Sequence, residues 1–492
     1  MRFDPNDLVF ASPFLLLSGL ACALLLLDAF ARSASRAFLC PLAVASCVLT
    51  LGALAHLWPE VGEQGKSIFA GMVLVDRFSL FVTATAVVGA ALSMMLAPGF
   101  MREHRFDYGE LYPLVLFATA GVSLMVSASD MVTLFLGLET MSLSVYVLTG
   151  SWRTNARSAE GAMKYFLMGA FASAILLYGM ALVYGSTGTT SLAAVDRAAA
   201  AMKEGDAVLV IGMVMIVIAF VFKVGAVPFH MWAPDAYQGA PTPITAFMAA
   251  AVKAAAFAAA LRVLMTSFPA PGLRATGNGW VYLLSGVSAL TMIFANLVAM
   301  RQDNVKRMLA YSSVAHAGYL LLGVVAVGVV GAEARTALLY YLLAYTFTTV
   351  GAFGVVAWIG SRGNERLLID DWSGLASRHP GMALAMTVFL LSLGGFPPTA
   401  GFFGKFYLFK AAMQRSELYP LVFVGVASSL VSVYYYLRVV MAMYFRPAHR
   451  PAEPIQSNAL TWALALSALG VLALGLLPGP ALQLASASLL GK

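Results

Sequence analysis

FKVGAVPFHMWAPDAYQGAPTP occupies residues 222–243, at the end of an apolar run that is long enough to cross a bilayer. A second long apolar run is interrupted in the same way by GGFPPTAG at residues 394–401. Proline lacks an amide hydrogen and clashes with the preceding turn, so helix breaks are predicted at Pro228 and at Pro397 and Pro398. In a membrane, broken backbone is tolerated only where it is buried in protein or lines water. These stretches therefore predict a membrane protein with a polar interior.

The composition supports this class of protein. Of 492 residues, 61% are hydrophobic and 11% are charged, whereas about 25% of residues are charged in a typical soluble domain. Soluble, disordered and disulfide-stapled secreted proteins are therefore excluded. The net charge is +7, but no run of five basic residues occurs, so nucleic acid is not an expected partner.

Apolar runs of about 20 residues predict an all-α polytopic protein with fourteen transmembrane helices. They lie near residues 9–31, 38–58, 71–97, 111–129, 131–150, 159–185, 207–227, 242–266, 279–300, 306–330, 335–360, 382–410, 418–445 and 459–477. The loops are too short to fold as a separate domain. Chemistry on a soluble substrate or a large cofactor is therefore expected in another chain.

The charges in the loops predict the orientation. One set of loops holds fourteen Lys and Arg residues, and the other set, with both termini, holds nine. Because basic loops stay in the cytoplasm, both termini are expected outside. Spans four to eight and nine to thirteen then form two inverted five-helix repeats, each broken at its fourth helix, which indicates a transport site. The expected segments are 1–110, 111–266, 279–445 and 446–492.

Ionisable residues inside the predicted spans are the candidate site. A charge at a helix centre costs about 2.5–3.5 kcal/mol, and one carboxylate cannot neutralise four lysines. Lysine can exchange a proton whereas arginine stays protonated, and histidine titrates near neutrality, so a proton relay is the favoured interpretation. The candidates are Glu139, Lys164, Lys223, Lys253, Lys405, His230 and His316.

Structural roles are the alternatives for several of these residues. Glu139 can form a plain ion pair with Lys164 or Lys223, and Lys164 can snorkel to the surface. Both histidines can be hydrogen-bonded packing residues. Near the ends of spans, Asp76 is expected to be structural and Arg262 to snorkel.

Cofactor motifs are lacking. Cys22, Cys40 and Cys47 form no C-x-x-C pair, and no Walker loop, G-x-G-x-x-G after a strand or H-E-x-x-H occurs. No metal, flavin or nicotinamide site is expected in this chain, and ATP-driven transport by it alone is not expected.

Three segments carry a family resemblance. Residues 222–243, DNVKRMLAYSS at 303–313 and GGFPPTAGFFGK at 394–405 resemble the antiporter-like membrane subunits of respiratory complex I and of multisubunit cation/proton antiporters. The resemblance covers about residues 70–445. The chain ends soon after the fourteenth span and has Lys405 where the M-type branch has a glutamate, so it most resembles the N-type branch of bacterial NADH–quinone oxidoreductase.

This resemblance implies roles for the candidates. Glu139 matches a glutamate that modulates the central lysine, Lys223 matches that proton carrier, and Lys253 matches the residue connecting the half-channels. Lys405 matches the twelfth-helix lysine. Lys164, His230 and His316 match further positions on or near the axis.

The resemblance also implies proton translocation coupled to quinone reduction elsewhere in the complex. FMN, iron–sulfur clusters and quinone are then expected in partner subunits. The expected partners are other membrane subunits, the peripheral redox arm and the lipids of a bacterial inner membrane. A D-type subunit of a sodium/proton antiporter, a membrane scaffold and a solitary solute transporter are the alternatives.

Overall fold

The computed structural model describes residues 4–30, 33–106, 108–201, 206–269, 273, 279–360, 365–448 and 454–491. The first half of this part contains α1 (Pro5–Phe10), α2 (Ser12–Phe30), α3 (Leu39–Glu60), α4 (Arg77–Glu103), α5 (Leu111–Val126), α6 (Met131–Thr149), α7 (Ala156–Thr187), α8 (Leu192–Ala201), α9 (Ala207–Lys223), α10 (Trp232–Gly239), α11 (Thr242–Phe247) and α12 (Lys253–Ser267). The second half contains α14 (Trp280–Ala299), α15 (Val305–Val330), α16 (Ala332–Trp358), α17 (Leu375–Arg378), α18 (Pro380–Gly394), α19 (Ala400–Ala412), α20 (Tyr419–Phe445), α21 (Asn458–Leu476) and α22 (Pro478–Ala487).

The helices confirm the predicted class of a polytopic all-α membrane protein. Within the described residues, 11 helices are long and apolar enough to cross a membrane, and three shorter apolar helices are α5, α9 and α18. Together these helices match the fourteen predicted spans one by one. The predicted twelfth span is divided between α18 and α19, and α10 follows the seventh after its break.

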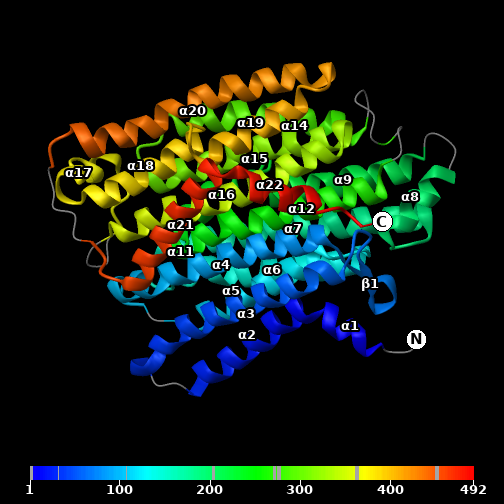
Figure 1. Cartoon of the computed structure of the whole chain (residues 1–492), viewed down its shortest axis with the longest axis horizontal. Helices are drawn as coiled ribbons and strands as arrows, with labels where there is room; N and C mark the ends of the chain where they lie inside the picture. Colours follow the sequence, from blue (N-terminus) through cyan, green and yellow to red (C-terminus); the bar gives the residue numbers. More distant parts are fainter. Residues whose placement is uncertain are drawn as a thin grey trace.

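The long helices run roughly parallel, as Figure 1 shows, with α2 and α3 at one edge of the bundle and α20 at the other. The span formed by α11 and α12 is the most enclosed, because its apolar window is 100% buried, whereas that of α2 is 28% buried. The apolar windows of α15 and α16 are both 89% buried. The polar residues on these central helices are therefore shielded from lipid.

Both ends of the chain lie at the same end of the bundle (Figure 1). They meet a small hairpin that the sequence did not predict, in which β1 (Lys66–Ile68) pairs antiparallel with β2 (Val73–Val75). The amide of Phe69, in the hairpin turn, donates to Asp7 Oδ2 at 3.0 Å. The amide of Gly491 donates to Asp76 Oδ2, just after the hairpin, at 2.8 Å.

The third span begins later than predicted because Asp76 caps it. The Asp76 carboxylate accepts from the amide of Ser79 at 2.8 Å, and the Ser79 hydroxyl accepts from the amide of Asp76 at 3.0 Å. This reciprocal capping box starts α4 at Arg77 rather than near residue 71. The expected snorkelling of Arg262 is wrong, because its side chain is 1% exposed and forms an ion pair with Asp76 at 2.7 Å.

The seventh span is broken as predicted. The chain leaves the helix around Pro228, between α9 and α10. Freed backbone groups find partners inside the protein: the amide of Val227 donates to Thr291 Oγ1 at 3.0 Å, and the indole of Trp232 donates to the carbonyl of Phe222 at 3.2 Å. Polar groups at the break thus have partners within the protein, although Pro228 itself is exposed on the surface of the chain.

The twelfth span is broken as well, around Pro397 and Pro398. Gly395 ends α18 with a φ of 86°, in the left-handed region that favours glycine. The amide of Gly401, at the start of α19, donates to Ser392 Oγ at 3.1 Å. The last carbonyl groups of α18 remain available to a cation.

Candidate functional site: buried lysines along a polar axis

Lys223 is the last residue of α9 and is buried. Its ammonium donates to Ser142 Oγ at 3.0 Å and to the Tyr146 hydroxyl at 3.1 Å. Both acceptors are on α6, three and seven residues after Glu139, so the three side chains share one helix face. Within the described residues, no carboxylate lies within ion-pair distance of Lys223.

Glu139 is half-buried at the middle of α6. Its Oε1 accepts a hydrogen bond from Ser173 Oγ of α7 at 2.5 Å. The ion pair considered as a structural alternative, Glu139 with Lys164 or Lys223, is not among the ion pairs of the described residues. Glu139 therefore lies on the same face of α6 as the two acceptors of Lys223, without an ion pair to that ammonium.

Lys164 departs from the expectation of a residue on the interior axis. Its side chain is 44% exposed, and it pairs with Glu160 of its own helix at 2.6 Å and with Asp235 of α10 at 2.8 Å. Glu160 and Lys164 are four residues apart, an ordinary pair on a helix surface. The structure thus separates Lys164 from the buried lysines.

Lys253 begins α12 and is buried at the centre of the bundle. Its ammonium donates to the backbone carbonyl of Ser313 at 2.6 Å and to Ser313 Oγ at 2.5 Å. A π-helical turn, Met248–Val252, immediately precedes it. Such turns shift the register of a helix and are frequent at functional sites. Through its two hydrogen bonds to Ser313, Lys253 links α12 to α15.

His316 lies one turn beyond Ser313 on α15 and is buried. Its Nδ1 shares a hydrogen bond with the Tyr341 hydroxyl at 2.8 Å, and its Nε2 lies 3.4 Å from the Tyr436 hydroxyl. The Tyr436 hydroxyl is also 2.5 Å from Ser312 Oγ. The Tyr436 hydroxyl therefore links His316 to Ser312, the residue before the Ser313 acceptor of Lys253.

Lys405 is buried on α19 and faces the broken end of α18. Its ammonium donates to the carbonyls of Leu393 at 2.9 Å and Gly394 at 3.3 Å, and to Ser429 Oγ at 2.9 Å. The end of a helix with free carbonyls carries partial negative charge, so the break creates a site for a cation. Lys405 also lies over the ring of Tyr319, 4.9 Å from its centroid.

His230 lies in the break between α9 and α10 and is buried. Its ring packs against Phe294 and Tyr311, with centroid distances of 5.0 and 6.5 Å. It sits beside the axis, near α14 and α15, and not in the run of hydroxyl contacts around His316.

A metal site is not evident in the described part of the chain. No group of three or more His, Cys, Asp or Glu residues there has the arrangement to hold an ion. Cys22, Cys40 and Cys47 are free thiols.

Comparison with known proteins identifies the family. A family model described as "NADH:quinone oxidoreductase/Mrp antiporter, TM" matches residues 128–432. The chain is 50% identical over 448 residues to NADH-quinone oxidoreductase subunit N 1 of Sorangium cellulosum, covering 90% of this chain and 88% of that protein. The chain belongs to this family, in its subunit N branch.

Two further comparisons extend the match over nearly the whole length. NADH-quinone oxidoreductase subunit N of Trichlorobacter lovleyi is 44% identical over 489 residues, covering 98% of this chain and 97% of that protein. A chain in the structure of respiratory complex I from Thermus thermophilus with bound Aureothin is 34% identical, with a TM-score of 0.79. That match covers 96% of this chain and 99% of the other.

Several polar residues of this subunit N-type chain were not singled out by sequence reasoning. Three acceptors of the lysines, Ser142, Tyr146 and Ser429, are uncharged and look like ordinary residues of a membrane helix. For the first two, the signal was present: they follow Glu139 at helical spacing. No such signal marks Ser429, which meets Lys405 only through the tertiary fold.

A second charged group was also missed, at the end of the bundle with the basic loops. Lys306, at the edge of the predicted tenth span, was expected among the charges of the loops, but its side chain is 0% exposed and pairs with Glu365 at 2.9 Å. Asp235 accepts from both Lys164 and Arg307, each at 2.8 Å. Sequence alone places these charges near span ends and cannot show that they are paired between helices.

Proposed function

We propose that this chain carries protons across the membrane as the N-type subunit of a proton-pumping NADH–quinone oxidoreductase. One observation carries the proposal: Lys223, Lys253 and Lys405 are all buried, and neutral oxygens are the hydrogen-bond partners of each ammonium. Breaking a buried ion pair leaves an unpaired charge. A lysine held by hydroxyls and carbonyls leaves no such charge when it releases its proton.

The proposed route starts at Lys223 and its hydroxyl partners. A change in charge near Glu139, driven by quinone reduction elsewhere in the complex, alters the proton affinity of Lys223. The proton then passes toward Lys253, which contacts Ser313. Water is required between Tyr146 and Lys253, because no hydrogen bond among the described residues joins them.

The second part of the route is built from hydroxyl groups. From Lys253 the proton passes to Ser313 and then by Ser312 and Tyr436 to His316, and from there to Lys405. Water is required between Ser313 and Ser312 and between His316 and Lys405, because no hydrogen bond among the described residues joins either pair. Hydroxyls can accept and donate in turn, so they can hand on a proton without changing their own charge. Lys405 then releases the proton to the outside. Glu139, Lys223, Lys253, His316 and Lys405 are the proposed proton-handling residues, with His230 beside them.

Lys164 has a different proposed role. Because it is exposed and paired with Asp235, it stabilises α10, the second half of the broken seventh span, against α7. Its positive charge matters for this role, and its ability to release a proton does not.

The proposed setting is the inner membrane of a bacterium. The end with the basic loops faces the cytoplasm, where such loops are retained. Both termini, at the other end, therefore face the periplasm. Residues 111–266 and 279–445 form the two inverted five-helix blocks. The partners are other membrane subunits of the complex and, through them, the peripheral arm with FMN, iron–sulfur clusters and quinone.

A sodium/proton antiporter subunit is the less supported alternative. The family model covers both kinds of complex, but the relatives that match nearly the whole chain are named NADH-quinone oxidoreductase subunit N. The two functions differ in driving force, because the antiporter needs an ion gradient and no redox reaction.

The test is a Lys223→Ala substitution in the complete complex. The purified complex is reconstituted in vesicles, and proton uptake is measured per electron passed from NADH to quinone. The proposal predicts a lower proton-to-electron ratio with the subunit still assembled. A normal ratio would show that Lys223 carries no proton, and sodium-dependent proton exchange without NADH would support the antiporter.

A further inference from the structure

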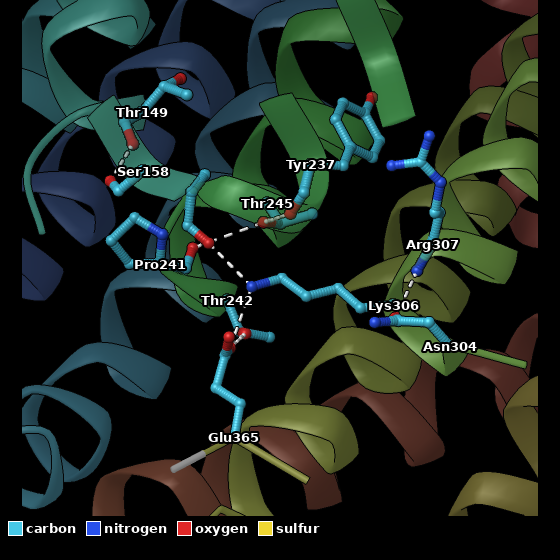
Figure 2. A network of polar contacts seen from close by, with 11 residues as sticks. Thr149, Ser158, Tyr237, Pro241, Thr242, Thr245, Asn304, Lys306, Arg307 and Glu365 are labelled. Atoms are coloured by element: carbon cyan, nitrogen blue, oxygen red, sulfur yellow. Dashed lines mark hydrogen bonds and ion pairs between the residues drawn. The ribbon is translucent and has the colours of Figure 1, made fainter. Parts of the chain in front are cut away.

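Lys306 and Glu365 form a buried contact outside the proposed proton axis. Figure 2 shows the Lys306 side chain extending from α15 toward Glu365 and Thr242. Its ammonium donates to Glu365 Oε1 at 2.9 Å and to the carbonyl of Ala240 at 2.8 Å. Thr242 Oγ1 donates to the same carboxylate oxygen at 2.5 Å. We call Lys306, Glu365, Thr242 and the Ala240 carbonyl the clamp.

Burial makes the clamp a specific contact. The Lys306 side chain is 0% exposed and that of Glu365 is 11% exposed. Lys306 also lies in the first turn of α15, where the helix dipole disfavours a positive charge. The carboxylate is therefore required to hold the ammonium there, unlike in an exposed pair.

The clamp joins segments that are far apart in the sequence. Ala240 and Thr242 lie at the junction of α10 and α11, in the proposed first block. Lys306 and Glu365 lie in the proposed second block. The segment that carries Glu365 is itself fixed to the start of α15, because the amide of Val305 donates to the carbonyl of Leu367 at 2.7 Å.

A second contact, next to the clamp, also joins the start of α15 to α10. Arg307, next to Lys306, donates to Asp235 at 2.8 Å and to Gln238 at 3.0 Å, both on α10. The first turn of α15 is therefore fixed to α10 and α11 by two neighbouring basic residues.

The same two spans meet again deeper in the bundle, at Lys253 and Ser313. Ser313 is seven residues from Lys306, about two turns or 10 Å along α15. Thr242 and Lys253 likewise lie on one span, α11 to α12. A shift of α15 at the clamp would therefore move Ser313 relative to Lys253.

We propose that Lys306 and Glu365 are positioning residues, which fix α15 against α11 and α12 so that Ser313 stays within reach of the Lys253 ammonium. The inference rests on the proposed proton axis. It assigns to the clamp no proton transfer of its own. Loss of the clamp misplaces the acceptor of Lys253 and lowers the efficiency of pumping without touching the redox reaction.

The test is Glu365→Gln in the complete complex reconstituted in vesicles. Subunit content, NADH–quinone activity and the proton-to-electron ratio are measured, and Lys253→Met sets the value expected when the Lys253 contact is lost. The Glu365→Gln complex is expected to assemble and to oxidise NADH. Its proton-to-electron ratio is expected to fall by at least half of the difference between the ratios of wild type and Lys253→Met.

Asp370→Asn is the matched control. Asp370 lies on the same segment as Glu365 and pairs with Arg446 at 2.7 Å, but the two side chains are 81% and 49% exposed. This variant is expected to keep the wild-type ratio. If Glu365→Gln does not assemble, the same criterion is applied to Thr242→Val, which removes the hydroxyl donor and keeps both charges.

Two results would overturn the inference. One is a wild-type ratio in the assembled Glu365→Gln complex. The other is a lower amount of complex with a wild-type ratio in what remains, which would make the clamp purely structural. Lys223→Ala in the same assay separates the proposals: if it is defective while Glu365→Gln is normal, the clamp alone fails, and if it pumps normally, the proton axis fails.

Discussion

The Lys223 ammonium lies 3.1 Å from the hydroxyl oxygen of Tyr146, which is on the same face of α6 as Glu139. Ser142, the other acceptor of this ammonium, lies on the same helix between Glu139 and Tyr146. Lys223 depends on this hydroxyl and on Ser142 for its hydrogen bonds, so its protonated state is sensitive to both.

Tyr146→Phe removes one of these two acceptors and keeps the ring. A hydrogen bond to a charged group contributes about 1.5–3 kcal/mol, so the protonated form of Lys223 is disfavoured and proton flux should fall about tenfold or more. Flux is measured in vesicles during NADH oxidation. Tyr178→Phe on α7 is the control, because Tyr178 is exposed, and an equal loss in both variants would contradict the role of Tyr146.

Tyr436→Phe tests the hydroxyl contacts around His316. The Tyr436 hydroxyl bridges Ser312 and His316, so its loss should lower the proton-to-electron ratio. Residues that act in one route are non-additive, and the double variant with His316→Gln should be no worse than His316→Gln alone. Tyr434→Phe, on the exposed side of the same helix, should have no effect. Additive losses would place the two residues in separate routes.

Lys164 should tolerate arginine better than methionine. Its contacts with Glu160 and Asp235 require a positive charge, which arginine keeps permanently. Lys164→Arg is expected to pump at the wild-type ratio, and Lys164→Met is expected to have a small defect in assembly or rate. The measurement is the ratio together with subunit content. A Lys164→Arg variant that assembles and fails to pump would contradict this role and indicate that Lys164 takes part in proton transfer.

Acidification should destabilise the subunit through His104, which follows α4 at the end of the bundle with the basic loops. Burial lowers the pKa of His104, and Glu365 partly offsets this effect. The unfolded chain binds a proton below about pH 6.5, whereas His104 in the folded chain binds one only at a lower pH, so stability falls as pH drops below that value.

His104→Phe provides the comparison, because a phenyl ring can pack against Phe100 and Trp152 as the imidazole does. The temperature at which the subunit leaves the purified complex is measured at pH 7.5 and 5.5. Between pH 7.5 and 5.5, this temperature should fall further in wild type than in His104→Phe. An equal fall in both would show that His104 does not contribute to the loss of stability in acid.

The spans and their breaks were predictable because they depend on local properties of the chain. Apolar runs must be long enough to cross a bilayer, and a proline such as Pro228 removes an amide donor and favours a helix break. The buried charges at Lys223, Lys253 and Lys405 were predictable as well, since they interrupt those runs.

The partners of the charges were not predictable. Ser429 and Lys405 meet across two helices, and the sequence gives no spacing that relates them. Lys164 and Lys306 illustrate the limit in opposite directions. Lys164 lies one to two turns inside a predicted span but is exposed, whereas Lys306 lies at the edge of a predicted span but is buried in the clamp.

The central claim is that the buried lysines release protons rather than only supply positive charge. Lys253→Arg tests it most directly, because the guanidinium retains charge and hydrogen-bond donors toward Ser313 but does not deprotonate. The measurement is the proton-to-electron ratio of the assembled complex in vesicles, beside Lys253→Met. The proposed mechanism predicts that both variants lose the same share of pumping. A wild-type ratio in Lys253→Arg would contradict proton transfer at this position.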